Sequence, residues 1–185
     1  AKNSIAVTSC TTALHLSLAA LGFGHGDEAI VPAFTWISDV ASVLQTGFEP
    51  KFVDINLDTL GLDTDKTIGA IDDNTRAVFI THAQGFNALS NKLVSYLEVN
   101  NIKLIEDVCE SHGASFNNKK CGSYGWMSNF SFYYAHHMST IEGGMVCTND
   151  EKTYQQARMF RSHGLLRESS DKSFISAKVK KYSEL

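Results

Sequence analysis

Short apolar runs alternate with longer amphipathic segments throughout the chain. Each run has the length of a buried β-strand and is rich in Val, Ile or Phe. The predicted strands cover residues 5–8, 28–31, 51–54, 77–82 and 103–107. Helical spacing of apolar side chains follows at residues 13–21, 37–47 and 89–99. This alternation predicts an α/β protein with three layers, α/β/α, in which helices cover both faces of a mostly parallel sheet.

The segment 130–147 contains a strand, a polar turn and the start of a second strand. Gly143 and Gly144 open the second strand, and the turn carries two adjacent histidines, His136 and His137. Polar or aromatic residues also follow the other predicted strands, at residues 8–12, 36, 82–87 and 107–112. Because parallel α/β sheets bind ligands at the carboxyl ends of their strands, we expect all of these residues to form one site.

Length and charge restrict the class of protein. The 185 residues suffice for one domain with a hydrophobic core, and 43% hydrophobic residues are typical of a folded protein. The net charge of −4 argues against nucleic acid as the partner. No apolar run reaches the ~20 residues that span a bilayer, and no secretory signal is visible. We therefore expect a cytoplasmic protein that binds neither nucleic acid nor a membrane.

The cysteines are dispersed along the chain. Cys10, Cys109, Cys121 and Cys147 form no Cys-x-x-Cys pair, so their spacing favours buried free thiols over disulfides or a zinc site. An iron–sulfur cluster needs several clustered cysteines, and none follows Cys147. We therefore expect neither a metal site nor an iron–sulfur cluster.

The residues between the first strand and the first helix are rich in hydroxyl groups. Ser9, Thr11 and Thr12 surround Cys10 at the predicted start of the helix. Free backbone N–H groups and hydroxyls at a helix N-terminus can bind a phosphate, although the same residues can simply cap the helix. Trp36 follows the second predicted strand, where it can either fill the core or present a flat face to a planar ligand.

Carboxylates follow the strand 103–107. Asp107 closes the strand and Glu110 comes three residues later. An acid in this place is often a cap or one half of an ion pair. It is also the group that a pyridine-ring cofactor needs, because it keeps the ring nitrogen protonated so that the ring can accept electrons. Glu110 could reach the phenolic oxygen of such a ring, or a water beside it.

Six short motifs, in order along residues 1–165, resemble the DegT/DnrJ/EryC1/StrS family of sugar aminotransferases. They are residues 9–14, 28–36, 106–114, 122–125, 130–133 and 142–144. The resemblance implies the type I, aspartate aminotransferase, fold, bound pyridoxal 5′-phosphate (PLP) and a homodimer with its active site at the interface. We therefore expect residues 1–165 to form a PLP-binding large domain, truncated at its start. Residues 166–185 would begin the connection to a C-terminal small domain.

The resemblance also assigns the cofactor contacts. The residues that it implies are Cys10, Thr11, Thr12, Trp36, Asp107, Glu110 and Ser131. Thr11, Thr12 and Ser131 would hold the phosphate through hydroxyl and amide groups. Trp36 would stack on the pyridine ring, and Asp107 would pair with the ring nitrogen.

Three positions depart from the family pattern. The usual glycine of the phosphate turn is Cys10, and the usual glutamine after the aspartate is Glu110. The position of the lysine that binds PLP covalently is His136, and no lysine lies between Lys120 and Lys152. Imidazole cannot form a stable covalent link to PLP, but it can accept and donate protons near neutral pH. PLP or its amine form, pyridoxamine phosphate (PMP), would then bind non-covalently.

The exchange of lysine for histidine resembles the 3-dehydratase branch of the family, which includes enzymes acting on GDP-4-keto-6-deoxy-D-mannose. The resemblance implies a lyase of deoxysugar biosynthesis, of the kind that serves lipopolysaccharide O-antigen. It would remove the C3 hydroxyl of a nucleotide-linked 4-keto-6-deoxy sugar, with glutamate regenerating PMP. His136 would be the catalytic base, while His137 and Gln84 would support the loop or contact the substrate.

Three other functions remain open. The chain could be a family member without transaminase activity that binds PLP or a sugar nucleotide as a regulator, or it could be a conventional nucleotide-sugar aminotransferase. A nicotinamide-dependent oxidoreductase is disfavoured, because no G-x-G-x-x-G turn follows the first strand. The sequence begins without methionine and enters a strand almost at once, so we expect a piece of a longer protein.

Overall fold

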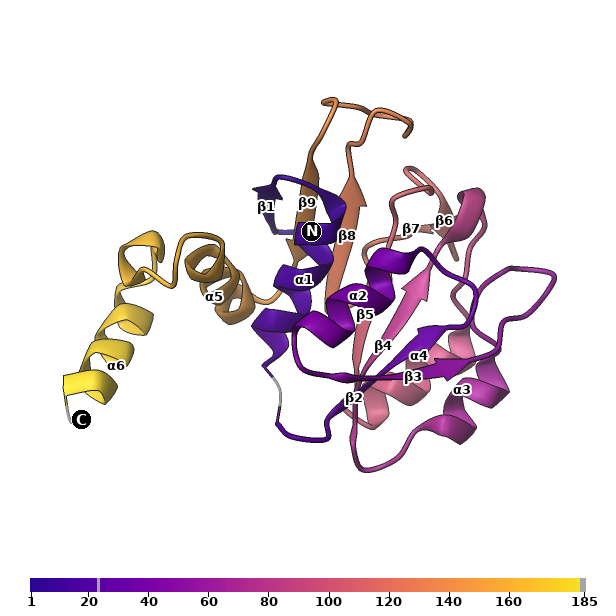
Figure 1. Cartoon of the computed structure of the whole chain (residues 1–185), viewed down its shortest axis with the longest axis horizontal. Helices are drawn as coiled ribbons and strands as arrows, with labels where there is room; N and C mark the ends of the chain where they lie inside the picture. The colour runs from indigo at the N-terminus through magenta and orange to yellow at the C-terminus, as the bar shows by residue number, and fades with distance from the viewer. Residues whose placement is uncertain (23, 184–185) are drawn as a thin grey trace.

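A seven-stranded sheet forms the centre of the fold (Figure 1). The computed structural model describes residues 1–22 and 24–183. In spatial order, the strands are β1 (Asn3–Val7), β9 (Gly144–Thr148), β8 (Met127–Ser131), β5 (Lys103–Asp107), β4 (Thr75–Thr81), β2 (Glu28–Pro32) and β3 (Glu49–Val53). All neighbours from β8 to β3 are parallel, which confirms the predicted, mostly parallel sheet.

The strand β9 runs antiparallel to both of its neighbours, β1 and β8. Between β5 and β8 the chain forms a small hairpin of β6 (Ser115–Phe116) and β7 (Lys119–Lys120), and β8 leads into β9 through a loop. The prediction that strands and helices alternate throughout is therefore wrong after residue 107. Antiparallel neighbours can be joined by a loop, whereas parallel neighbours need a crossover connection, which the β6–β7 segment supplies between β5 and β8.

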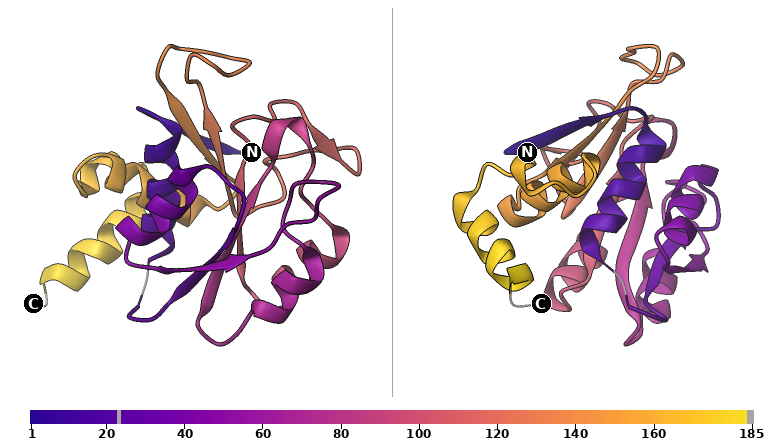
Figure 2. Two further views of the ribbon diagram at one scale, coloured as in Figure 1. Left: turned by 45° about the vertical axis from the view of Figure 1, so that its right-hand side comes forward. Right: turned by 60° about the vertical axis from the view of Figure 1, so that its left-hand side comes forward.

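Helices cover both faces of the sheet (Figure 2). On one face lie α3 (Thr64–Ala70) and α4 (Asn91–Val99), and on the other lie α1 (Cys10–Leu21), α2 (Ile37–Gln45) and α5 (Glu151–Arg161). In β4, Val78 and Ile80 join the apolar cluster beneath α4, while Ala77 and Phe79 join the cluster beneath α1. Burial on both faces explains the continuous apolar strands and confirms the predicted three layers.

After α5 the chain leaves the sheet. It forms the short helix η2 (Leu166–Glu168) and then α6 (Lys172–Ser183), which points away from the sheet (Figure 1). The domain boundary near residue 165 stays a prediction. Among the described residues, no helix is both long and apolar enough to cross a membrane.

The helix predicted at residues 37–47 is confirmed as α2, but it turns apolar side chains outward. Ile37 and Leu44 are 68% and 59% exposed. The side chains of Ser38, Asp39 and Ser42 are buried instead. A buried polar helix face needs hydrogen-bond partners. Asp39 has one in Thr81 at the end of β4 and Ser38 has one in Thr11 of α1, whereas the buried Ser42 hydroxyl has none among the described residues.

A buried carboxylate, Glu106, organises the turn that precedes β8. Its two oxygens accept hydrogen bonds from the backbone N–H groups of Gly122 (2.7 Å), Tyr124 (2.8 Å) and Gly125 (2.5 Å). The Nε2–H of His82 also donates to it (3.1 Å), while Nδ1 of His82 accepts from a backbone N–H and so carries no proton. Burial acts to raise the pKa of Glu106, but these hydrogen bonds outweigh it and hold the pKa below its usual range.

Candidate active site

A cavity of about 690 Å³ opens at the carboxyl ends of the parallel strands. Its walls come from the start of α1, the β2–α2 loop, the ends of β4, β5 and β8, and the loop before β9. Of the predicted site residues, the cavity is lined by Cys10, Thr11, Trp36, Gln84, Asp107, Glu110, Ser131 and His136. Thr12 and His137 do not line it. The structure therefore brings most of the predicted residues to one place.

The hydroxyl-rich turn caps α1 and also faces the cavity. The hydroxyl of Ser9 accepts a hydrogen bond from the backbone N–H of Thr12 (3.2 Å), which is the ordinary capping arrangement. The Thr12 hydroxyl bonds to Ser9 (3.0 Å) and Thr8 (3.1 Å), so it is turned away from the cavity. The Thr11 hydroxyl lies 2.9 Å from the Ser38 hydroxyl of α2. This cap leaves the start of α1 available to an anion.

Gly144, the first residue of β9, lies in close contact with this turn. A Cβ at Gly144 would collide with the backbone of Ser9 and would lie 2.8 Å from the N atom of Cys10. On the neighbouring strands, Gly144 pairs with Val7 and Ser131. A glycine at this position therefore lets the turn, Ser131 and the loop of the histidines approach one another.

Two carboxylates lie beneath the cavity. Asp107 is almost fully buried and accepts a hydrogen bond from the backbone N–H of Cys109 (2.9 Å). Asp39 is fully buried, and one of its oxygens accepts from the hydroxyls of Thr35 and Thr81 (2.7 Å for Thr81). Burial and the charge of Asp107 raise the pKa of Asp39 well above its usual range. The charged form of Asp39 is thus disfavoured beside the carboxylate of Asp107.

Sequence reasoning missed Asp39 and the threonines that hold it. Asp39 stands among apolar residues at helical spacing, which gave no sign that its side chain is buried. The signal that could have identified Thr81 is its position at a strand end, where it pairs in register with Asp107.

Trp36 and Glu110 flank the cavity. Trp36 is 71% exposed, so it does not fill the core and its ring is free to meet a planar ligand. Glu110 accepts a hydrogen bond from the backbone N–H of Gln84 (2.9 Å) in the short helix η1 (Ala83–Gly85). This bond fixes Glu110 at the cavity wall and brings Gln84 beside it.

The two adjacent histidines occupy different environments. His136 is half-buried and lines the cavity, and its backbone N–H donates to the carbonyl of Tyr133 (3.0 Å). His137 is exposed, and its ring lies 6.1 Å from the ring of His112. Burial and the charges of His136 and His137 lower the pKa of His112. The neutral ring of His112 therefore packs against the loop. Glu142, which the sequence analysis did not select, also lines the cavity.

The cavity thus combines a helix start that can bind an anion, an exposed aromatic face, a buried carboxylate and an imidazole. None of the described residues that line it is a lysine. These groups fit a flat, phosphorylated aromatic ring with a basic nitrogen, because a carboxylate such as that of Asp107 can pair with the protonated nitrogen. They provide no amine to hold such a ring covalently.

Comparison with known proteins gives a family. The pattern of the DegT/DnrJ/EryC1/StrS aminotransferase family matches residues 1–180. The chain is 37% identical to the GDP-4-keto-6-deoxy-D-mannose 3-dehydratase of Escherichia coli O55:H7 (strain CB9615 / EPEC), over 95% of the chain and 47% of that relative. It is 38% identical to the GDP-perosamine synthase of Caulobacter vibrioides (strain ATCC 19089 / CIP 103742 / CB 15), over 89% of the chain and 44% of that relative.

A solved structure confirms the expected fold. The crystal structure of GDP-4-keto-6-deoxymannose-3-dehydratase with a trapped PLP-glutamate geminal diamine matches this chain with a TM-score of 0.85 and 38% identity. The match covers 90% of this chain and 45% of that one. The chain therefore spans less than half the length of the proteins that it matches.

Proposed function

The chain belongs to the DegT/DnrJ/EryC1/StrS aminotransferase family, and from this premise we propose that it is part of a PLP- and PMP-dependent sugar 3-dehydratase. The substrate would be a nucleotide-linked 4-keto-6-deoxy sugar, and glutamate would supply the amino group of PMP. The observation that carries the proposal is that His136 lies on the cavity wall. The sequence resemblance assigns this residue to the position of the family lysine. The relatives named as 3-dehydratases and the structure that contains PLP and glutamate support it.

The cofactor would bind across the start of α1 and the ends of β5 and β8. Thr11, Ser131 and the free N–H groups of α1 would hold its phosphate, and Thr12 would hold the turn in place through its hydrogen bonds to Ser9. Asp107 would hold the ring nitrogen protonated, and Trp36 would cover one face of the ring. When bound, the cofactor supplies an electron sink for carbanion chemistry at the substrate.

His136 would perform the proton transfer that elimination of the C3 hydroxyl requires. His136 is half-buried and lines the cavity, where its imidazole could accept a proton and return it as the hydroxyl leaves. Glu110, held by the N–H of Gln84, would orient a polar group of the ring or a water. His137 would act only through the loop, because its ring packs on His112 outside the cavity.

The first test of this proposal is covalent capture of PLP. The His136→Lys variant should bind PLP covalently, with an absorption band near ~415 nm and, after borohydride reduction, an added PLP mass on the peptide that carries position 136. His137→Lys is the matched control and should show neither. No capture by His136→Lys in a folded protein would contradict the assignment of His136 to the lysine position.

The second test is turnover. Ammonia release from a GDP-linked 4-keto-6-deoxy sugar, in the presence of PLP and glutamate, should fall by about 100-fold or more in His136→Asn. Glutamate alone should convert bound PLP to a species that absorbs near ~330 nm. A family member that only binds the cofactor would show no spectral change with glutamate, and this is the alternative that the assay separates.

A homodimer is the proposed assembly. Apolar side chains are exposed beside the cavity on the β2–α2 loop and on α2, which is typical of a surface that meets another protein. They are Phe34, Trp36, Ile37 and Leu44. Because Trp36 also lines the cavity, the same surface would place a second subunit next to the cofactor.

A further inference from the structure

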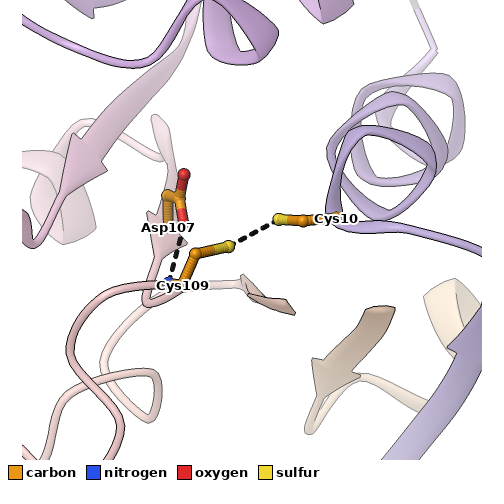
Figure 3. A group of neighbouring side chains, drawn as sticks. All are labelled: Cys10, Asp107 and Cys109. Carbon is orange, nitrogen blue, oxygen red and sulfur yellow. Dashed lines mark hydrogen bonds between the residues drawn. The ribbon is translucent and has the colours of Figure 1, made fainter. Parts of the chain in front are cut away.

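Two thiols from distant parts of the sequence meet on the wall of the cavity. Cys10 begins α1, and Cys109 follows the end of β5 by two residues (Figure 3). Their Sγ atoms lie 2.6 Å apart, and Cys109 donates its backbone N–H to Asp107. All four cysteines are free thiols in the structure; Cys109 and Cys121 are buried, as expected, whereas Cys10 and Cys147 are half-buried. The pairing of two of them was not predicted, because it depends on the order of the strands.

The short separation favours one kind of chemistry. A tetrahedral metal bound to two thiolates at 2.3 Å keeps their sulfurs about 3.8 Å apart, whereas a disulfide joins them at about 2.05 Å. The observed 2.6 Å between Cys10 and Cys109 needs only a small further approach to form a bond. We propose that Cys10 and Cys109 form a reversible disulfide in the cofactor cavity, through exchange with a low-molecular-weight disulfide.

The thiol–disulfide exchange proceeds in two steps, through a mixed disulfide. The thiolate of Cys10, which is the less buried of the two, attacks one sulfur of the small disulfide and expels a small thiolate. Cys109 then loses its proton and attacks the Cys10 sulfur, expelling the second small thiolate. Two protein thiols are oxidised to one disulfide, and one small disulfide is reduced to two small thiols.

The surroundings make this oxidation slow at neutral pH. The hydrogen bond to Cys10, burial and the negative charge of Asp107 all raise the pKa of Cys109. The hydrogen bond from Cys109 lowers the pKa of Cys10, but burial and the charge of Asp107 outweigh it and raise that pKa. Since the thiolate is the reactive form, the exchange quickens as pH rises.

A bound cofactor protects the pair. The phosphate proposed for the start of α1 adds negative charge beside Cys10 and covers its sulfur. This part rests on the proposed function, whereas the disulfide itself rests only on the positions of the two sulfurs.

Oxidation of the purified, reduced chain tests the disulfide. After incubation with oxidised glutathione at pH 8, we expect titratable thiols to fall from four to two, and peptide mapping to find Cys10 joined to Cys109. The bond closes a long loop and should raise Tm by about 10 °C. Saturating PLP should slow the loss of thiols at least fivefold.

Matched variants separate this pair from the other thiols. Cys10→Ser and Cys109→Ser should each keep their three remaining thiols, and Cys10→Ala repeats the test if serine disturbs folding. Cys147→Ser, on β9, should fall from three thiols to one.

Different failures overturn different parts of the proposal. Four thiols after prolonged oxidation, or a linked peptide other than Cys10–Cys109, overturn the disulfide. So does one equivalent of tightly bound Zn²⁺ that blocks both thiols, since it would make the pair a metal site with Asp107. Equal oxidation rates with and without PLP overturn only the protection by the cofactor. The capture of PLP by His136→Lys tests the cofactor site independently of the thiols.

Discussion

The layer beneath α4 and the layer beneath α2 are buried to the same degree but are built from opposite chemistry. α4 buries Leu93 and Leu97 against the apolar face of the sheet. α2 buries Ser38, Asp39 and Ser42 besides the apolar Val43, and it leaves Ile37 exposed. The apolar layer maintains the fold, whereas the polar layer lies beside the cavity and holds a carboxylate there. The buried polar side chains of α2 thus mark the layer that lies beside the cavity.

The buried Glu106 is the group in the apolar layer whose loss should cost most. The Glu106→Gln variant replaces one acceptor oxygen by an NH₂ group that faces backbone N–H donors, and we expect about 4 kcal/mol less stability. Urea unfolding monitored by circular dichroism measures this. A loss below about 1 kcal/mol would mean that the turn at residues 122–125 does not depend on the carboxylate.

The stability of the folded protein should depend on pH through the same carboxylate, Glu106. The pKa of Glu106 is lower in the folded protein than in the unfolded chain, so its contribution is complete above the unfolded pKa of about 4.3 and is lost as pH falls through the folded value. Stability should therefore decline on acidification below about pH 5, and less steeply in Glu106→Gln. A series of urea midpoints against pH compares the two proteins, and equal slopes would assign the acid sensitivity to other groups.

Shortening an apolar side chain in the layer beneath α4 should have the next largest effect on the free energy of unfolding. Leu97→Ala leaves a cavity beneath α4 and should destabilise the fold by about 3 kcal/mol. PLP affinity of the folded protein should stay unchanged, because no part of α4 lines the active-site cavity. Thermal unfolding and a PLP titration measure the two quantities, and a large loss of affinity would contradict the division between the layers.

The polar layer should be less sensitive to substitution. Asp39→Ala should cost about 1.5 kcal/mol, since Thr35 and Thr81 can still bond to each other at 2.8 Å. Asp39→Asn keeps both the shape and a donor, and should restore most of that stability. If Asp39 instead carries a charge that the fold needs, the Asn variant will be as unstable as the Ala variant.

The smallest effect on folding is expected on the exposed face of α2. Ile37→Ser should change the free energy of unfolding by less than about 0.5 kcal/mol, because the side chain is exposed, yet it should weaken self-association. Val99→Ser, which is exposed at the end of α4, is the matched control and should leave association unchanged. Sedimentation velocity over a range of concentrations separates these outcomes.

The strands and the place of the site could be predicted because they depend on local patterns. Each apolar run became a strand, and the residues after the strands gathered at one edge. Helix α3 was not predicted, since its sequence is short and polar and relies on a cap from Asp63. The Asp39 layer and the Cys10–Cys109 contact were also missed, because they arise between segments that only the strand order brings together.

Because β9 runs antiparallel to β8, the loop that carries His136 and His137 can be exchanged without changing the rest of the fold. Because β8 and β9 are antiparallel, residues 132–143 leave and re-enter the sheet at the same edge, next to the cavity. The loop can therefore be replaced by another of similar span without rerouting the chain or moving a helix. A lysine-bearing loop could be grafted onto this frame while the turn at residues 8–12 and Asp107 stay where they are.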